Sequence, residues 1–446
     1  MTRYVLSARL GATDTATVPT AADEHLSQLD FVDGRSLRHG IGRALRDLKR
    51  LDLQPSSIAL DLLMIAVLVH AADTRINRTQ ASQDNWTREI RLVAPVSDPQ
   101  RWNSQRLLLA NILRFLTGDL WAVSFRTWPS QVPHPIADRA SPAAAAPFDR
   151  VSLFSGGLDS LIGAIDSIEA GAIPLFASYA GDSSVSSPQA ELFDALAKRY
   201  ASQREIARLR LAMRLEDAAI PGIGTENSTR GRSFLFFALG VAAGSAFGKS
   251  FTLQVPENGL ISLNVPLDGT RLGSASTRTT HPYYIHRWNE LLKSMGIPCT
   301  IYNPYWNKTK GEMIRDCLNP ESLKRLAKLS ISCAHPSYKR YAQDNVDHCG
   351  TCVPCIIRRA AFRSSPMADP TVYRTKKLPT HTSDASTAEA EQVRAFQYAL
   401  RRLEGNPHAA ALWIHKPGPL LEDTDKLGTL AGVYARGMAE VKALLK

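Results

Sequence analysis

The stretch Ser155-Gly156-Gly157-Leu158-Asp159-Ser160 decides the fold of this 446-residue chain. It follows a short apolar run at residues 151–154 and precedes a helical pattern of apolar residues that ends at Gly171. A strand, a glycine turn and a helix in this order aim several backbone N–H groups at one point, at the positive end of the helix dipole. Glycines let an anion approach the backbone closely, because they have no Cβ atom. The stretch therefore predicts a cradle for pyrophosphate.

Three polar side chains in the same stretch refine this prediction. Ser155 and Ser160 add hydroxyl donors to the backbone N–H groups. The carboxylate of Asp159 suits an anion site only if a cation is also present, and Mg²⁺ bridging to phosphate would explain it. We therefore expect a bound Mg²⁺ beside the phosphates.

The hexapeptide resembles the SGGxDS signature of the PP-loop ATP pyrophosphatases. Members of that family cleave ATP between its α- and β-phosphates and pass AMP to an acceptor. An ordinary strand-to-helix turn is the simpler alternative, but a match at all six positions between a strand and a helix favours the family. The resemblance implies that ATP and Mg²⁺ are cofactors. It also implies that ATP binds to Ser155, Gly156, Gly157, Leu158, Asp159 and Ser160.

The alternation of apolar runs predicts an α/β fold for the central block, residues 150–365. Strands are expected at residues 151–154, 173–179, 207–212, 251–255 and 300–302, with helices between them. This alternation is typical of a doubly wound parallel sheet, which binds its ligand at the carboxyl ends of the strands. The glycine turn follows the first of these strands, as that rule requires.

Three further segments flank this block. Residues 1–133 are expected to form an α+β module, with helices at 37–51, 58–72 and 102–116 and strands at 90–96 and 120–125. The polar and aromatic residues at 73–78, with Trp86 and Arg88, suit either a partner-binding face or a packed domain surface. Residues 134–149 are rich in Pro and Ala and predict a linker. Residues 366–446 predict a second linker and a helical tail, with helices at 387–403 and 425–445.

Composition narrows the classes of partner. The 53 Lys and Arg against 42 Asp and Glu give a net charge of +11, which fits a polyanionic ligand such as ATP or weak contact with nucleic acid. No dense basic tract is present, so we expect no dedicated nucleic-acid-binding region. The N-terminus lacks the apolar core of a signal peptide. The apolar segment 58–72, interrupted by Asp61 and His70, is expected to be too short for a membrane span and to form a buried helix.

Cysteine spacing predicts a metal centre. Cys349, Cys352 and Cys355 follow one another at CxxCxxC spacing, and Cys333 lies upstream. Four thiolates at this density suit tetrahedral Zn²⁺ in a closed, structural site, although an iron–sulfur cluster and a redox dithiol are alternatives. Six cysteines in a long chain without an export signal argue against a disulfide framework, and we expect a cytoplasmic protein.

The two motifs together resemble the 7-cyano-7-deazaguanine synthase (QueC) family over roughly residues 150–363. Residues 231–233 resemble its GRN segment, with Ser233 in place of the usual Asn, and residues 309–314 resemble its TK-x-E-I-V segment. Arg358 and Phe362 resemble the ending that follows its last cysteine, and Gln189 and Glu191 are a looser match to its Gln/Glu-containing region. The resemblance implies a zinc knuckle on Cys333, Cys349, Cys352 and Cys355.

In that family, ATP adenylates the carboxylate of 7-carboxy-7-deazaguanine and an amine then displaces AMP. The resemblance implies Asp159, Lys310 and Arg232 as catalytic residues. Both side chains suit the stabilisation of negative charge in the transition state, Lys310 as a compact positive charge and Arg232 as a forked set of N–H donors. A surface cation in a solvated loop is the simpler interpretation of each.

The chain also departs from the synthase, which is a compact single domain. The added segments, with Asp61-Leu62-Leu63 and Thr117-Gly118-Asp119, resemble the QueC-like proteins of bacterial anti-phage operons, the QatC group of the Qat system. The segment 256–282 differs from the synthase's aspartate-rich substrate segment. Its candidate substrate-binding residues are Glu257, Asn258, Arg278, Thr280 and His281, although each also suits a structured polar loop.

This resemblance implies that a deazaguanine carboxylate is activated and passed to an amine, including an amine on a protein partner from a defence operon. The alternatives are a conventional 7-cyano-7-deazaguanine (preQ0) synthase of queuosine biosynthesis, a PP-loop enzyme that modifies tRNA, and a non-catalytic nucleotide-binding subunit. The intact Asp159 and Lys310 argue against the last of these.

Overall fold

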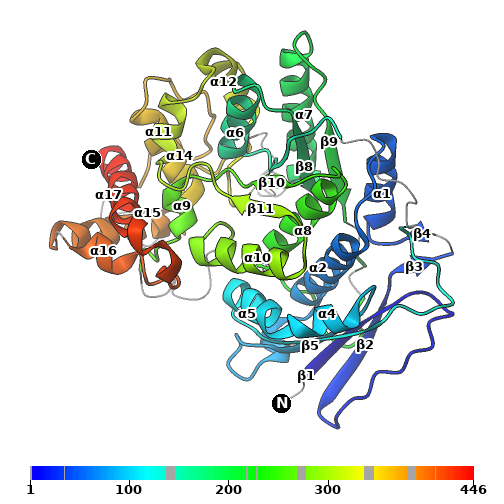
Figure 1. Cartoon of the computed structure of the whole chain (residues 1–446). Helices are drawn as coiled ribbons and strands as arrows, with labels where there is room; N and C mark the ends of the chain where they lie inside the picture. The colour runs from blue at the N-terminus through cyan, green and yellow to red at the C-terminus, as the bar shows by residue number, and fades with distance from the viewer. Residues whose placement is uncertain are drawn as a thin grey trace.

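Two parallel β-sheets organise the chain (Figure 1). The first has the order β2-β1-β5-β6, from β1 (Arg3–Arg9), β2 (Glu24–Asp30), β5 (Glu89–Val96) and β6 (Leu120–Thr127). The second has the order β11-β10-β7-β8-β9, from β7 (Arg150–Leu153), β8 (Pro174–Ala180), β9 (Arg208–Ala212), β10 (Phe251–Gln254) and β11 (Cys299–Tyr302). The computed structural model describes residues 3–34, 36–136, 146–181, 183–213, 215–216, 219–227, 230–268, 278–335, 346–379, 388–406 and 408–446.

The five expected strands of the central block are all present, and every neighbouring pair in that sheet is parallel. Helices cover both of its faces. On β8, Phe176 faces a core that includes residues of α6 (Leu158–Glu169) and α7 (Ser183–Tyr200). Leu175 and Ala177 face the opposite core, which includes α8 (Arg232–Ser245) and α10 (Pro282–Ser294). The prediction of an α/β fold with a parallel sheet is confirmed.

The first sheet corrects the expectation of an α+β module, because each of its strand pairs is parallel. Helices α2 (Ser57–Arg75), α4 (Pro99–Ser104) and α5 (Arg106–Thr117) pack against it. Helix α1 (Ile41–Arg50) packs against β9 of the central sheet, and α3 (Arg78–Ala81) follows α2. A short antiparallel pair, β3 (Val32–Asp33) and β4 (Ser36–Leu37), precedes α1. Strands β1 and β2 were not expected, since the polar residues in both weaken the apolar pattern.

Helix α2 joins the two sheets. Its Ser56 cap accepts a hydrogen bond from the Ala59 N–H at 3.3 Å, and the helix packs against α8. At 19 residues it is long and apolar enough to cross a membrane, which corrects the expectation of a segment too short to do so. The fold buries 89% of the apolar stretch of this helix, so the expected buried helix is confirmed.

The polar segment near residue 73 is part of the interior. Arg88 has no exposed surface and pairs with Asp119 at 2.7 Å and with Asp73 at 3.1 Å. Arg78 also pairs with Asp119, at 2.7 Å. Asp73 accepts a hydrogen bond from the Gly231 N–H of the central block at 2.7 Å. Of the two interpretations of this segment, the packed domain surface is the one observed, because each charge has an opposite charge within contact distance.

The C-terminal helices pack on the edge of the central block (Figure 1). They are α15 (Ala388–Glu404), α16 (Ala409–Trp413), η4 (Leu421–Lys426) and α17 (Leu427–Leu445). Helix α17 packs against α14 (Val353–Arg363) and α9 (Gly259–Leu263). The remaining helices, α11 (Lys310–Arg315), α12 (Pro320–Leu326) and η2 (Ala327–Leu329), precede the cysteines. Residues 137–145 and 380–387, in the two expected linkers, lie outside the described residues.

Candidate functional site

The glycine turn lies where the strand order of the central sheet reverses. Among the strands of this sheet, β7 comes first in the sequence, and it lies between β8 and β10. Connections therefore leave β7 and β10 toward opposite faces, which opens a crevice at their carboxyl ends. Ser155 and Gly156 follow β7 at this crevice, and α6 starts at Leu158. The expected position of the turn is thus confirmed.

Gly156 has a backbone conformation that favours glycine, with φ +86°. A Cβ atom there would lie 3.1 Å from the Cβ of Gln189, which is tighter than usual packing. Gln189 holds the turn from α7, since its Nε2 donates to the Ser155 carbonyl at 3.1 Å and the Phe154 carbonyl at 3.3 Å. On the other side, the Ile331 N–H donates to the Gly156 carbonyl at 2.9 Å. The turn is therefore fixed by two distant segments.

Hydroxyl groups surround the start of α6. Gly157 is its N-cap and supplies no side-chain cap. The Gly157 N–H donates to Ser155 Oγ at 3.3 Å, and Ser155 Oγ donates to Ser160 Oγ at 3.2 Å. The Leu158 N–H donates to Ser332 Oγ at 3.3 Å. Weak bonds to movable hydroxyls leave these N–H groups available to an anion at the positive end of the helix.

Asp159 is the centre of a buried charge cluster. Its Oδ1 lies 2.9 Å from the Nζ of Lys310, the first residue of α11. Its Oδ2 accepts hydrogen bonds from the Asn258 N–H at 3.1 Å and from Asn258 Nδ2 at 2.7 Å. Asp159 is 9% exposed and Lys310 5%. Asn258 and Lys310, which follow Asp159 by about 100 and 150 positions in the sequence, thus converge on its carboxylate.

Glu257 lies beside this cluster, and the pKa of its side chain is raised. Burial, and then the negative charge of Asp159, raise its pKa from the ordinary 4.5 to about 7, against the effects of Thr280 and Lys310. Thr280 Oγ1 donates to Glu257 Oε2. Asn303 fixes the backbone of Glu257, accepting from its N–H at 3.2 Å and donating to its carbonyl at 2.7 Å. Four of the expected residues (Asp159, Lys310, Glu257 and Asn258) therefore share one site, with Thr280 at its edge.

Three expected residues lie elsewhere in the fold. Arg232 lies at the carboxyl end of β8, with its guanidinium over the Phe236 ring and its charge acting on Tyr179. Within the described residues, no hydrogen bond or ion pair joins Arg232 to Asp159 or Lys310. Its guanidinium therefore lies near the end of β8 and away from the contacts of Asp159 and Lys310.

Arg278 and His281 pack against the N-terminal part of the chain. Arg278 donates to the Phe115 carbonyl at 3.0 Å. His281 caps α10 by accepting from the Tyr283 N–H at 3.2 Å, and its ring centroid lies 5.3 Å from that of Phe115. Burial lowers the pKa of His281 to about 3, so the ring is neutral at pH 7. These contacts are those of a structural junction.

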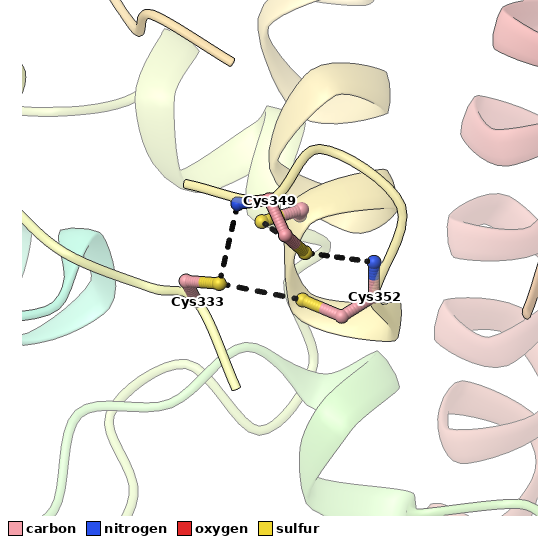
Figure 2. A group of neighbouring side chains, drawn as sticks. Cys333, Cys349 and Cys352 are labelled. Atoms are coloured by element: carbon pink, nitrogen blue, oxygen red, sulfur yellow. Dashed lines mark hydrogen bonds between the residues drawn. The ribbon is translucent and has the colours of Figure 1, made fainter. Parts of the chain in front are cut away.

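The four cysteines form one cluster, which could hold a metal ion such as zinc (Figure 2). All four Sγ atoms lie within 4.8 Å of one another, with 3.9 Å between Cys333 and Cys352 and 4.0 Å between Cys349 and Cys355. A Zn–S bond of about 2.3 Å places tetrahedral sulfurs about 3.8 Å apart. The spacing therefore matches a tetrahedral site, and it is too long for disulfides.

Backbone groups complete the cysteine cluster. The Cys349 N–H donates to Cys333 Sγ at 3.4 Å, and the Cys352 N–H donates to Cys349 Sγ at 3.3 Å (Figure 2). Such donors favour the thiolate form that binds a metal. Cys352 caps α14 and Cys355 lies in its first turn, with no exposed surface. The expectation of a four-cysteine metal site is supported by this geometry.

Arg358 connects the cysteine cluster to the glycine turn. It is fully buried on α14, and its guanidinium donates to Ser330 Oγ at 2.9 Å and to Ser332 Oγ at 3.3 Å. Ser332 in turn accepts from the Leu158 N–H, at the start of α6. The knuckle therefore supports the segment that closes one side of the turn.

Sequence reasoning missed Ser332, Asn303 and His348, which border the site. His348 Nε2 accepts from the Ser332 N–H at 3.3 Å. Each lies next to an expected feature, since Ser332 precedes Cys333, His348 precedes Cys349 and Asn303 follows the last expected strand. The only sequence signal for these residues is their position, directly after a strand or directly before a cysteine of the predicted metal site.

No protein-family model matches the chain, and no curated protein matches it with significance.

Proposed function

We propose that this protein is an ATP pyrophosphatase of the PP-loop class that adenylates a carboxylate and passes the acyl group to an amine. The observation that carries the proposal is the meeting of the Ser155–Ser160 turn with the Asp159–Lys310 pair at the crevice of a parallel sheet. An anion-binding helix start and a buried cation are what a triphosphate requires.

In the proposed reaction, an oxygen of the substrate carboxylate attacks the α-phosphorus of ATP. The bond from the α-phosphorus to the bridging oxygen breaks, and pyrophosphate leaves with the electron pair. The N–H groups of Gly157 and Leu158 and the Ser155 and Ser160 hydroxyls bind the leaving group. Lys310 holds positive charge against the phosphates, because the transition state carries more charge there than the ground state.

Asp159 and Glu257 are the two carboxylates that would hold Mg²⁺, which supplies neutralising charge to the phosphates when it is bound. The donor set fits a hard cation, since both side chains offer oxygen ligands and the charge of Asp159 already acts on Glu257. Lys310 then serves as the partner of Asp159 when no cation is present.

The acyl acceptor completes the proposal. An amine attacks the acyl carbon of the mixed anhydride, AMP leaves, and the amine loses a proton. Solvent water takes that proton, because the Glu257 carboxylate is the proposed ligand of Mg²⁺. Following the resemblance, we propose a 7-deazaguanine carboxylate as the acid and an amine of a defence-operon protein as the acceptor, in the cytoplasm, where thiols stay reduced.

The test is to incubate the protein with ATP, Mg²⁺ and 7-carboxy-7-deazaguanine, and to measure AMP and pyrophosphate. We expect release of both products, and a fall of about 10²–10³-fold in Lys310→Met, the cost typical of removing one transition-state donor. Lys308→Met is the matched control. Its Nζ pairs with Asp316 at 3.1 Å on the exposed side of the same loop, so activity should not change.

The products separate the alternatives. A mass increase on a copurifying protein supports conjugation, whereas free nitrile as the only product supports a conventional synthase. Loss of activity after ribonuclease treatment would indicate a tRNA substrate. If neither AMP nor pyrophosphate appears with any acid or amine, the proposed reaction is wrong, and a non-catalytic nucleotide-binding subunit is the alternative to test by ATP binding.

A further inference from the structure

Helix α17 lies against the starts of two helices that supply the charge cluster (Figure 1). Helix α11 begins with Lys310, and α9 is capped by Asn258; both residues contact Asp159. Helix α17 packs against α9 and α11. None of its own residues contacts Asp159 within the described part of the chain, so any effect on the site passes through these two helices.

The contact with α11 is polar and close. Thr309, the cap of α11, donates through Oγ1 to Glu440 of α17, and the Gly311 N–H donates to the same carboxylate at 3.4 Å. A Cβ atom at Gly311 would lie 2.5 Å from Glu440 Oε1 and 2.5 Å from Ser364 Oγ. Only glycine therefore permits the carboxylate to sit this close. The Glu440 carboxylate thus binds the residues on both sides of Lys310.

A second pair strengthens this contact. Arg436, one helical turn before Glu440, donates to Glu312 Oε1 at 2.6 Å and to the Asn307 carbonyl at 2.9 Å. Glu312 completes the capping box of α11 by accepting from the Thr309 N–H at 2.8 Å. The first turn of α11 is therefore fixed by its own cap and by two residues of α17.

The contact with α9 is apolar and equally close. Gly437 lies against Leu260, where a Cβ atom would meet the leucine side chain at 2.9 Å. A Cβ at Gly259 would likewise lie 2.9 Å from Val433 of α17. Asn258 immediately precedes these residues and caps α9 through its Oδ1, leaving its N–H and Nδ2 for Asp159. Movement of α17 would therefore shift Asn258 as well.

We infer that α17 is a positioning element of the candidate site and that Glu440 is a positioning residue for Lys310. By binding Thr309 and Gly311, Glu440 sets the direction in which the first turn of α11 presents the lysine to Asp159. The catalytic consequence of this role rests on the proposed function, whereas the placement of Lys310 does not.

The placement is tested by the reactivity of Lys310 with an N-hydroxysuccinimide ester, followed by peptide mass mapping of the full-length protein. Lys310 is 5% exposed and paired in the native fold, so its labelling should be slow. In Glu440→Ala we expect the labelling rate of Lys310 to rise about ten- to hundredfold, as expected when bonds to a charged group are lost. Glu440→Gln keeps the volume and one acceptor, and its rate should lie between the two.

The matched control is Glu404→Gln. Glu404 pairs with Lys442 of α17 at 2.7 Å on an exposed face, so its loss leaves the contact with α11 intact. Labelling of Lys310 should stay within twofold of the parent protein. A Glu440→Gln protein that is folded, yet labels Lys310 as slowly as the Glu404→Gln control, would overturn the inference even if Glu440→Ala fails to fold.

Activity supplies a separate readout. If ATP is cleaved as proposed, Glu440→Gln should lower kcat for pyrophosphate release about tenfold with little change in the KM for ATP, because the glycine turn is untouched. If Glu440 only stabilises the fold, Glu440→Ala and Glu440→Gln should lower Tm without increasing the labelling of Lys310 in the folded protein. Absence of ATP cleavage in the parent protein would reject the proposed function while the labelling result still decides the role of Glu440.

Discussion

Glu257 is a residue of the candidate site whose pKa is raised by the fold. Its side chain is partly buried, and its pKa is raised from 4.5 to about 7 by burial and by Asp159. Between these two pH values the folded state binds more protons than the unfolded state, so the free energy of unfolding falls as pH rises. The fold therefore carries a cost at this residue above pH 7 that is absent below about pH 4.5.

Glu257→Gln should remove that cost. Gln can still accept the hydrogen bond from Thr280, and it carries no charge at any pH. We expect the variant to be more stable than the parent at pH 8, by up to about 3 kcal/mol from a shift of this size, and to lose most of the advantage near pH 5. Denaturant unfolding at both pH values measures the difference.

Glu169→Gln is the control for the pH effect. Glu169 accepts hydrogen bonds from Tyr200 and Asn319 on the outside of the fold, and these bonds lower its pKa, with Asn319 the larger cause. Its variant should show no gain of stability at pH 8. A Glu257→Gln gain that is equal at pH 5 and pH 8 would contradict the assignment of Glu257 as the titrating group.

Local signals made part of the site predictable at the scale of single residues. The glycine turn and the four cysteines are short-range patterns with strong geometric requirements, so their places in the fold agree with expectation. The partners of Asp159 are different, since Asn258 comes from a segment that was expected only to bind substrate. Nothing in the sequence near Glu440 indicates a partner about 130 residues earlier, because side-chain contacts between distant segments leave no periodicity.

At the scale of elements, α17 contains three glycines, and two of them, Gly428 and Gly437, lie in opposite surroundings. Gly437 packs against Leu260, whereas an added Cβ at Gly428 would meet nothing within 4 Å. Helix propensity alone favours alanine over glycine at an interior position by about 1 kcal/mol. Packing and propensity therefore oppose each other at Gly437 and agree at Gly428.

We expect Gly437→Ala to lower the free energy of unfolding by about 1–3 kcal/mol, the usual cost of overpacking a close contact. Gly428→Ala, near the start of the same helix, should leave stability unchanged or raise it slightly. Thermal and denaturant unfolding of the two variants provide the comparison. If Gly437→Ala and Gly428→Ala stabilise the protein equally, Gly437 and Leu260 are not in close contact.

The elements also show where reasoning from sequence fails. The expected helix at residues 102–116 is two helices, α4 and α5, which meet at Gln105. The strands β1 and β2 contain exposed and half-buried polar positions, since β2 lies at the edge of its sheet. Amphipathic pattern identifies elements with one buried face, and it is weak for edge strands and for short helices.

At the scale of the whole molecule, the cysteine cluster and the glycine turn are parts of one structure. Two consecutive hydrogen bonds, from Arg358 to Ser332 and from Leu158 to Ser332, connect them. Loss of a metal from the cysteines should therefore loosen the turn as well as the knuckle, because the ligands lose their common partner.

The protein should bind one Zn²⁺ per chain, and Cys352→Ser should abolish that binding and lower Tm by on the order of 10 °C. Elemental analysis and thermal unfolding measure the two effects. Cys317→Ser is the matched control, since this buried thiol lies outside the cluster and contacts the Asn319 carbonyl at 3.8 Å. Iron with inorganic sulfide in the purified protein would instead identify an iron–sulfur cluster.

The contact between Glu440 and α11 has a consequence for synthesis on the ribosome. Proteins emerge from their N-terminal end at about 5–20 residues per second, so Lys310 emerges on the order of ten seconds before Glu440. During that interval both sheets are available to fold, but the helix that orients the lysine has not been made. A nascent chain that has already formed its glycine turn would therefore hold an incomplete site until α17 docks.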